Sequence, residues 1–322
     1  MRKVSLFFML AAAISLGCET DHPVGIRPQH DLGFDPWAHL PTNPGTIGPW
    51  FAPFVFQDID QDNGGIWLDA LTSFTYDNDW AGGNNWDNVF SYPEHSHVYA
   101  SITETADFYF VYYSFFHARD YSQQPGVPFG LDNHENDQES IMMVVDKAYT
   151  SSTWPYGTPV IVETHDHRFP DGPIIRAYRN CTFSDYMISP RWQSFEDQCI
   201  QFIWDDRTVG VVGPHYRTAI YVEAHGHGVS MHTGNSLIYN FGGGDGWVYL
   251  PGTTADVPQY PDGQLQYTLI SLLTNELQGQ PGSLWTRRLS SGGYCSTSTY
   301  DNLEMDVVGP YDVTIWRSPQ GL

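Results

Sequence analysis

The sequence predicts a mostly β protein: an antiparallel β-sandwich with long loops and one peripheral helix. Short apolar or alternating runs recur from Phe51 onward, and clusters of Gly, Pro, Asn and Asp separate them. Such clusters form turns between strands. Aromatic residues make up 15% of the chain, and aromatic and β-branched residues are enriched in strands. Many short strands bounded by turns are typical of a sandwich.

The expected strands are the runs at 51–57, 66–76, 97–103, 108–116, 140–146, 159–164, 173–178, 199–204, 219–224, 236–241, 247–250 and 312–316. One segment has a different period, because leucines recur at spacings of three and four (residues 265, 269, 272, 273 and 277). This spacing predicts an amphipathic helix over 263–278, ended by Gly279.

The N-terminus predicts export. Arg2 and Lys3 precede an apolar run over 4–16, so residues 1–17 are expected to be a signal peptide. Cys18 follows directly, which favours a bacterial lipoprotein acylated at Cys18 and anchored in the outer membrane or at the cell surface. The alternative is ordinary cleavage nearby and secretion, with Cys18 left as a thiol or disulfide partner.

Residues 18–50 are rich in Pro and lack a periodic apolar run, so they are expected to be a tether before a single domain over 51–322. Cys181 and Cys199 lie close in sequence, and an exported protein meets an oxidising compartment, so we expect them to form a disulfide. Cys295 then stays unpaired if Cys18 is acylated, or pairs with Cys18 if it is not.

The charge balance excludes some partners. Asp and Glu total 37 against 14 Lys and Arg, a formal net charge of −23. So acidic a chain argues against nucleic acid and against polybasic docking to anionic lipid. It is compatible with cation binding or with neutral ligands.

The strongest site prediction is the heptad at 133–139, which lies between the apolar runs at 108–116 and 141–145. Asp137 and Glu139 are two apart and share a face of the expected strand. His134 lies in the turn before this strand, and Asp120 follows the preceding strand. Three carboxylates and one imidazole therefore predict a divalent metal site, with calcium or magnesium favoured and zinc or manganese as alternatives.

The same residues carry a resemblance to a known family. The element Phe116–Asp120 followed by the heptad resembles the core of the secreted necrosis-and-ethylene-inducing-like proteins, although Asn133 stands where Gly is usual and Gln138 where Trp is usual. The segment Tyr221–His227 resembles a second element of the Vps62-like family. The resemblance is at superfamily level and covers residues 95–240.

This resemblance implies a divalent metal on Asp120, His134, Asp137 and Glu139. It also implies recognition of glycosylated sphingolipid head groups and damage to membranes. A permanently anchored lipoprotein fits poorly with a free cytolysin, so the metal site is the part that we carry over.

A second acidic element runs from Asp58 to Gly65. Alternating carboxylates before Gly resemble a calcium loop, with ligands expected at Asp58, Asp60, Asp62 and Asp69. An EF-hand is excluded because its sixth position is Asn63 and its twelfth is Asp69, where Gly and Glu are required. The alternative is a solvated acidic turn.

Two further groups have both a functional and a plain interpretation. Trp80, Asn84 and Trp86, with His227, are candidates for binding a glycan; alternatively, the indoles tuck into the sandwich from a hairpin loop. Histidine pairs at 95/97, 165/167 and 225/227 have the spacing of one strand face. His225, then His165, and also Glu135, are candidate general bases beside a metal-bound water; alternatively, such histidines are hydrogen-bonded at strand ends.

Three functions follow from these features. The first is an exported metal-binding protein that recognises a glycan or lipid head group at a cell surface. The second is a metal-dependent hydrolase with a metal-activated water. The third is a structural surface lipoprotein whose calcium only braces loops. No Gly-x-Ser-x-Gly element or phosphate-binding loop supports other catalysis.

Overall fold

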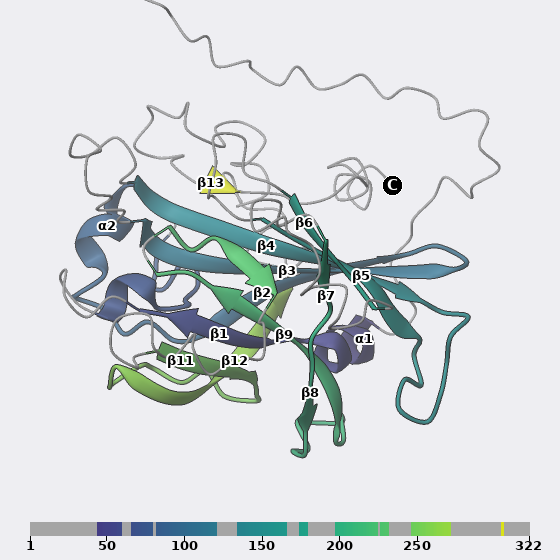
Figure 1. Ribbon diagram of the computed structural model, residues 1–322. Helices are drawn as coiled ribbons and strands as arrows, with labels where there is room; N and C mark the ends of the chain where they lie inside the picture. Colours follow the sequence, from purple (N-terminus) through teal and green to yellow (C-terminus); the bar gives the residue numbers. More distant parts are fainter. Residues whose placement is uncertain are drawn as a thin grey trace, which may run out of the picture. The chain divides into compact units, whose positions relative to one another are not determined.

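The computed structural model describes residues 44–59, 66–79, 82–120, 134–165, 174–179, 197–224, 226–231, 246–271 and 304–305. The chain divides into two units, Met1–Pro36 and Trp37–Leu322, and every described residue belongs to the second. The elements (Figure 1) are α1 Pro44–Phe51, β1 Phe54–Asp58, η1 Ile66–Asp69, η2 Gly82–Asn84, α2 Asn85–Asn88, β2 His97–Glu104, β3 Phe108–Asp120, β4 His134–Asp146, β5 Thr158–His165, β6 Ile174–Tyr178, β7 Asp197–Cys199, β8 Phe202–Asp205, β9 His215–Val222, β10 Val229–Met231, β11 Gly246–Pro251, β12 Asp262–Ser271 and β13 Glu304–Met305.

The mostly β prediction is confirmed, but the two separate antiparallel sheets of a sandwich are not what the described strands form. They join in one mixed sheet with the order β10-β9-β1-β11-β12-β2-β3-β4-β5-β6-β7, and β13 and β8 branch from β4 and β9. The pairs β1–β9, β11–β12, β12–β2, β6–β7 and β13–β4 are parallel.

The sheet curls around its own core. Met143 of β4, Val55 of β1 and Val222 of β9 belong to one buried cluster, although several strands separate β4 from β9 in the sheet. We call this cluster, which also holds Ile141, Tyr113 and Trp247, the main core. A curled sheet buries one face against itself as a sandwich does, and this is why strand alternation alone predicted two sheets.

The β3–β4 hairpin is the longest pairing of the sheet and positions the site (Figure 1). Both faces of β3 are buried: Val111, Tyr113 and Phe115 pack into the main core, while Phe110 and Phe116 pack into a second cluster on the other face. This explains why the sequence reads as a continuous apolar run.

The predicted helix over 263–278 is wrong for its described part, because residues 262–271 form strand β12. Leu265 and Leu269 are four residues apart, a spacing that places them on one side of a helix and equally on one face of a strand. Tyr267 between them is fully buried in the main core, while Gln266 and Thr268 alternate with this set. Period two is therefore the correct one here, and residues 272–278 lie outside the described part.

Two other segments differ from the simplest expectation. The run at 66–76 is a short 3₁₀ helix and a turn, from which Phe74 packs onto Phe116 of β3. Residues 44–50, at the end of the expected tether, form most of α1, whose Ile47 is buried in the main core. None of the helices in the described ranges is long and apolar enough to cross a membrane.

Candidate metal centre

The candidate site lies where the core face of the β3–β4 hairpin changes from apolar to polar. Along β4 the core face carries Met143, Ile141, Glu139 and Asp137 in turn, at every second residue. In register, Asp137 pairs with His117 of β3, so the two side chains share this face. Asp137 is 2% exposed and His117 is fully buried.

His227 reaches this pair from the turn after β9. Its Nδ1 lies 2.6 Å from Oδ2 of Asp137, and its Nε2 lies 3.2 Å from Oδ1 of Asp69 at the end of η1. Its ring stacks on that of His117 at 3.6 Å between centroids and 4° between planes. The left-handed backbone of His227, with φ 51°, points the ring inward from a tight turn. Four elements distant in sequence thus meet at one buried point.

Gln57 of β1 fixes the tautomer of His117. The Nε2 of Gln57 donates to the carbonyls of Asp58 and Glu223, at 3.0 and 3.2 Å, so its Oε1 is left as an acceptor. That oxygen lies 3.2 Å from Nε2 of His117, which must therefore carry the proton. The Nδ1 of His117 then presents a lone pair, and it has no hydrogen-bond partner in the described part of the chain. An imidazole oriented through its second nitrogen is the usual form of a metal ligand.

The two histidines have opposite pKa shifts. Burial by itself would lower the pKa of His227, but hydrogen bonds to Asp137 and Asp69 outweigh it and raise the pKa to about 10. Burial and the neighbouring charge of His227 lower the pKa of His117 well below its usual range. At neutral pH, therefore, one imidazolium holds two carboxylates together and one neutral imidazole lies against it.

Three side chains satisfy the spacing of a metal centre. One ligand atom each from His117, Asp137 and His227 lies within 4.8 Å of the other two. Two nitrogens and one carboxylate oxygen suit a first-row transition ion, whereas calcium takes six to eight oxygens. The donor types suit a divalent ion, but the two imidazole planes are parallel and 3.6 Å apart, so one ring must rotate before both nitrogens can bind the same ion. In the metal-free protein, the proton on His227 supplies the positive charge between the two carboxylates.

A further buried carboxyl group, that of Glu94, interacts with Asp69 of this centre. Burial raises the pKa of Glu94 well above its usual range, with Arg119 acting in the opposite direction and Asp69 in the same one. Both carboxyl oxygens of Glu94 lack a hydrogen-bond partner among the residues whose placement is described. Glu94 is thus expected to be neutral at pH 7, whereas Asp69 and Asp137 are the hydrogen-bond partners of His227.

The structure brings together only part of the set predicted from the heptad. Asp137 is in the centre, and Glu139 is fully buried two residues further on the same face. Asp120 pairs in register with His134, three residues beyond His117 on β3, and residues an odd number apart face opposite sides of a strand. The side chain of His134 lies outside the described residues. Ligation by Asp120, His134 and Glu139 therefore stays a prediction.

The residues of the expected calcium loop go to different partners. Asp58 accepts hydrogen bonds from the hydroxyl of Tyr221 at 3.0 Å and from the backbone of Ile59 at 3.1 Å. Asp69 lies at the His227 ring instead. Asp60 and Asp62 lie outside the described residues, so the calcium loop itself also stays a prediction.

The expected glycan-binding loop is partly described. Trp86 is half-buried, its ring lies 4.3 Å from the guanidinium of Arg119, and its backbone N–H donates to Glu135 at 3.0 Å. Glu135 thus anchors the start of α2, which gives this candidate base a structural partner. Asn84 donates to Asp79 at 3.1 Å. His227 lies in the candidate metal centre instead of this loop.

Several predicted residues cannot be placed, because Trp80, Cys18, Cys181, Cys295 and His225 lie outside the described residues, as does the side chain of His165. Cys199 ends β7, and its pairing with Cys181 stays a prediction.

Sequence reasoning missed two members of the centre, His117 and Gln57. Both carry a recognisable signal, because each is a polar residue on an otherwise buried face of its strand. His117 continues the core-facing positions that include Phe115, and Gln57 follows Val55 in the same way. A polar group on a buried strand face needs a partner, and here the partner is the other residue of this pair.

Comparisons with known proteins give distant likenesses in structure. No protein-family model matches the chain, and no curated protein matches its sequence. A solved structure described as a toxin fold for microbial attack and plant defense matches with 12% identity and a TM-score of 0.29. NLPPya in complex with mannosamine matches with 12% identity and a TM-score of 0.28, and non-toxic HaNLP3 with 16% identity and a TM-score of 0.20.

The first two matches cover 69% of this chain and 65% of the other, and the third covers 39% and 51%. The chain thus spans less than two thirds of the length of the solved structures that it matches. These likenesses are distant, with 12% to 16% identity.

Proposed function

We propose that this protein binds a divalent metal through His117, Asp137 and His227 and uses it to recognise a glycan or lipid head group. The observation that carries the proposal is the convergence of three buried ligand atoms within 4.8 Å. Gln57 orients His117 for ligation, and Asp69 orients His227. Such outer partners fix ligand geometry and tune affinity.

The donor set alters the expected metal. Oxygen-rich ligation favoured calcium or magnesium, but two imidazoles favour zinc, and the carboxylate also admits manganese. Zinc and manganese are therefore the ions that we would test first. When bound, the metal supplies positive charge for a ligand oxygen, while His117, Asp137 and His227 fix its place against the β3–β4 hairpin.

A neutral, hydroxyl-rich ligand fits this protein better than an anion. The formal charge of −23 repels anions at long range. Sugar and glycerol hydroxyls bind to a metal centre without needing a positively charged surface. The N-terminal sequence predicts export, and sugar and glycerol hydroxyls are displayed at cell surfaces.

The test has two steps on the full chain. Metal content of the purified protein and calorimetric titration with Mn²⁺, Zn²⁺ and Ca²⁺ measure binding, with Asp137→Asn and His117→Gln as site variants and His97→Gln as a matched control. We expect the two site variants to lose at least tenfold in metal affinity and the control to lose none. Unchanged affinity in both site variants would falsify the metal centre.

A glycan and lipid array read with and without chelator then tests recognition. Binding that chelator abolishes, and that Asp137→Asn also abolishes, supports the proposal. Binding that ignores the chelator contradicts it. Turnover of ester or phosphodiester substrates that requires the metal would replace recognition by hydrolysis.

A further inference from the structure

A second candidate site lies on the face of the sheet that points away from the main core. A hollow of about 290 Å³ is lined by β1, β8, β11 and β12. Its floor is apolar (Phe54, Phe56, Ile203, Val248 and Leu250), and its remaining lining is polar or aromatic (Trp204, Asp205, Asp206, Arg207 and Gln264). Nothing in the metal centre uses any of these side chains.

Strand alternation separates this hollow from the metal centre. On β1, Gln57 points to the core side and contacts His117, whereas Phe54 and Phe56 point to the other face and line the hollow. On β11, Tyr249 is in the main core, while its neighbours line the hollow. The two sites are therefore on opposite faces of the same strands.

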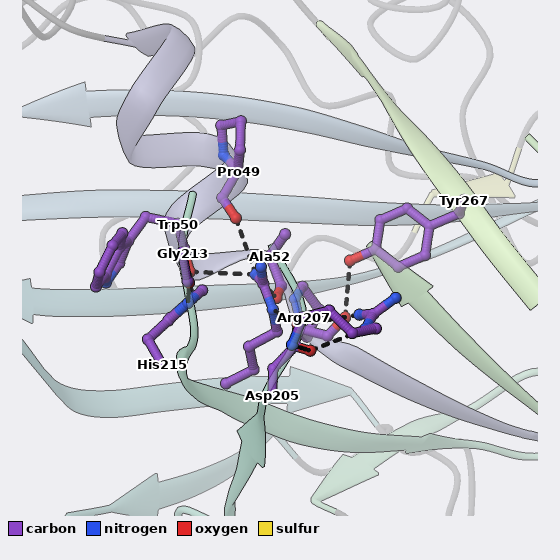
Figure 2. Close-up of polar contacts among 10 residues, drawn as sticks. Pro49, Trp50, Ala52, Asp205, Arg207, Gly213, His215 and Tyr267 are labelled. Atoms are coloured by element: carbon purple, nitrogen blue, oxygen red, sulfur yellow. Dashed lines mark hydrogen bonds and ion pairs between the residues drawn. The ribbon is translucent and has the colours of Figure 1, made fainter. Parts of the chain in front are cut away.

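A rigid polar network holds Arg207 at the hollow. Its Nε and Nη2 donate to the two oxygens of Asp205 at 2.8 and 3.0 Å, and its guanidinium lies 5.6 Å from the ring of Phe54. Asp205 also accepts from the Nε of fully buried Arg217 at 2.6 Å. The Nη1 of Arg217 donates to the carbonyls of Pro49 and Ala52, at 2.9 and 3.0 Å, which ties the network to the end of α1. Figure 2 shows Pro49, Ala52, Asp205 and Arg207 of this network.

This network fixes the direction of Arg207 without using all its donors. A bidentate Arg–carboxylate pair occupies one edge of the guanidinium and leaves N–H groups on the other edge for a ligand. Arg207 is 30% exposed, whereas Asp205 is 1% exposed, so the ligand reaches the arginine and not the carboxylate. Preorganised donors lose little entropy on binding.

An aromatic platform stands at the rim. Trp204 on β8 is 51% exposed, and Tyr216, its partner in register on β9, meets its ring edge-on at 5.1 Å between centroids. Tyr216 is itself 39% exposed. Trp204 alternates with Ile203 along β8, so it reaches the hollow around the open edge of this strand and not from the floor. An exposed indole held by a neighbour at this edge presents an apolar ring to a ligand.

We propose that this hollow binds one neutral pyranose ring of a glycan, independently of the metal. Trp204 and the apolar floor take the C–H faces of the ring. Arg207 donates to its hydroxyls, Asp206 accepts from them, and Gln264 does both, which suits groups that are donors and acceptors at once. A volume near the lower end of ligand pockets, roughly 300 Å³, fits a single ring.

Local charge favours a neutral sugar over an acidic one. Arg207 and Arg217 are balanced by Asp205 and Asp206, so these four groups sum to no net charge. The whole chain adds a negative field. This site goes beyond the metal-dependent recognition proposed above and does not rest on it.

The experiment is saturation-transfer NMR on the full chain in EDTA. The probes are the methyl glycosides of glucose, galactose, mannose and their N-acetylhexosamines, with methyl glucuronide as the acidic comparison. We expect saturable binding of at least one neutral glycoside. Trp204→Ala and Gln264→Ala should weaken it at least tenfold and severalfold respectively, and both positions are exposed, so both variants should fold. Tyr149→Ala, at an exposed aromatic outside the hollow, is the matched control.

The outcomes separate the two sites. Binding that survives EDTA and Asp137→Asn but not Trp204→Ala establishes the hollow as a sugar site, whatever happens to the metal centre. No saturable binding of any neutral glycoside, binding of the glucuronide alone, or equal binding by Trp204→Ala and wild type overturns this inference and leaves the metal proposal untouched.

Discussion

Metal binding at the proposed centre should release about one proton. His227 has a pKa of about 10 because Asp137 and Asp69 hold its protonated form. An imidazole must lose one proton to ligate a metal. His117 is already neutral, since burial and the charge of His227 lower its pKa. The proton released therefore comes from His227.

The magnitude follows from this shift. Below a pKa of about 10, each unit of pH changes the fraction of deprotonated His227 tenfold. Metal affinity should then rise about 100-fold between pH 6 and 8, or about 2.7 kcal/mol. In the metal-free protein, the free energy of unfolding has the opposite dependence on pH. The stability that the raised pKa gives is complete below about pH 6.5 and is lost as pH rises through about 10, a few kcal/mol in all.

The assay is calorimetric titration of Mn²⁺ in buffers of different ionisation enthalpy, which counts the protons released. Asp69→Asn removes one of the two carboxylates that raise the pKa of His227, so we expect the rise of affinity with pH to level off at a lower pH. His227→Gln should reduce the proton count to near zero. A wild-type count near zero, or a pH dependence that His227→Gln leaves unchanged, would show that another set of residues binds the metal.

Three further predictions concern the stability of the fold around the two sites. Arg217→Met leaves the buried Asp205 carboxylate with Arg207 as its single side-chain partner. It should lower the free energy of unfolding by about 3 kcal/mol in denaturant titration, and a loss below about 1 kcal/mol would contradict the role given to this network. His97→Gln should remove part of the loss of stability in acid, because burial first, and then His95, lower the pKa of His97 to about 4. The stability that neutral His97 contributes is complete above about pH 6.5 and is lost as pH falls through about 4, by about 2 kcal/mol. Equal acid sensitivity of variant and wild type would count against this prediction. Gly157→Ala should lower stability by about 2 kcal/mol or more, because its φ is 106° and a Cβ would lie 2.5 Å from a backbone oxygen. Gly210→Ala, at a residue with φ 60° and open space around it, should cost about 1 kcal/mol. Equal shifts of the two melting temperatures would refute this difference.

Local pattern was enough to predict the strands that build the metal centre. The apolar runs of β3 and β4 and the face shared by Asp137 and Glu139 follow from alternation, which needs no distant contact. The helix predicted over 263–278 is wrong over 263–271, because the spacing of four between Leu265 and Leu269 fits either period. Tyr267 between these leucines is buried against distant strands, and this contact favours a strand.

The rest of the centre depends on long-range geometry. His117 faces Asp137 through the register of the β3–β4 pairing, which no short motif specifies. His227 and Asp69 arrive from a turn and a 3₁₀ helix that are brought together only when the sheet curls. The one mixed sheet was missed for the same reason, since alternation shows which residues share a face but not which strands are neighbours.

A structure determined from crystals grown with Mn²⁺, with its anomalous signal, tests the central claim most directly. We expect one strong peak at bonding distance from a nitrogen of His117, a nitrogen of His227 and an oxygen of Asp137. A peak on Asp120, His134 and Glu139 that leaves His117 and His227 unligated, or no peak within the β3–β4 hairpin, would contradict it.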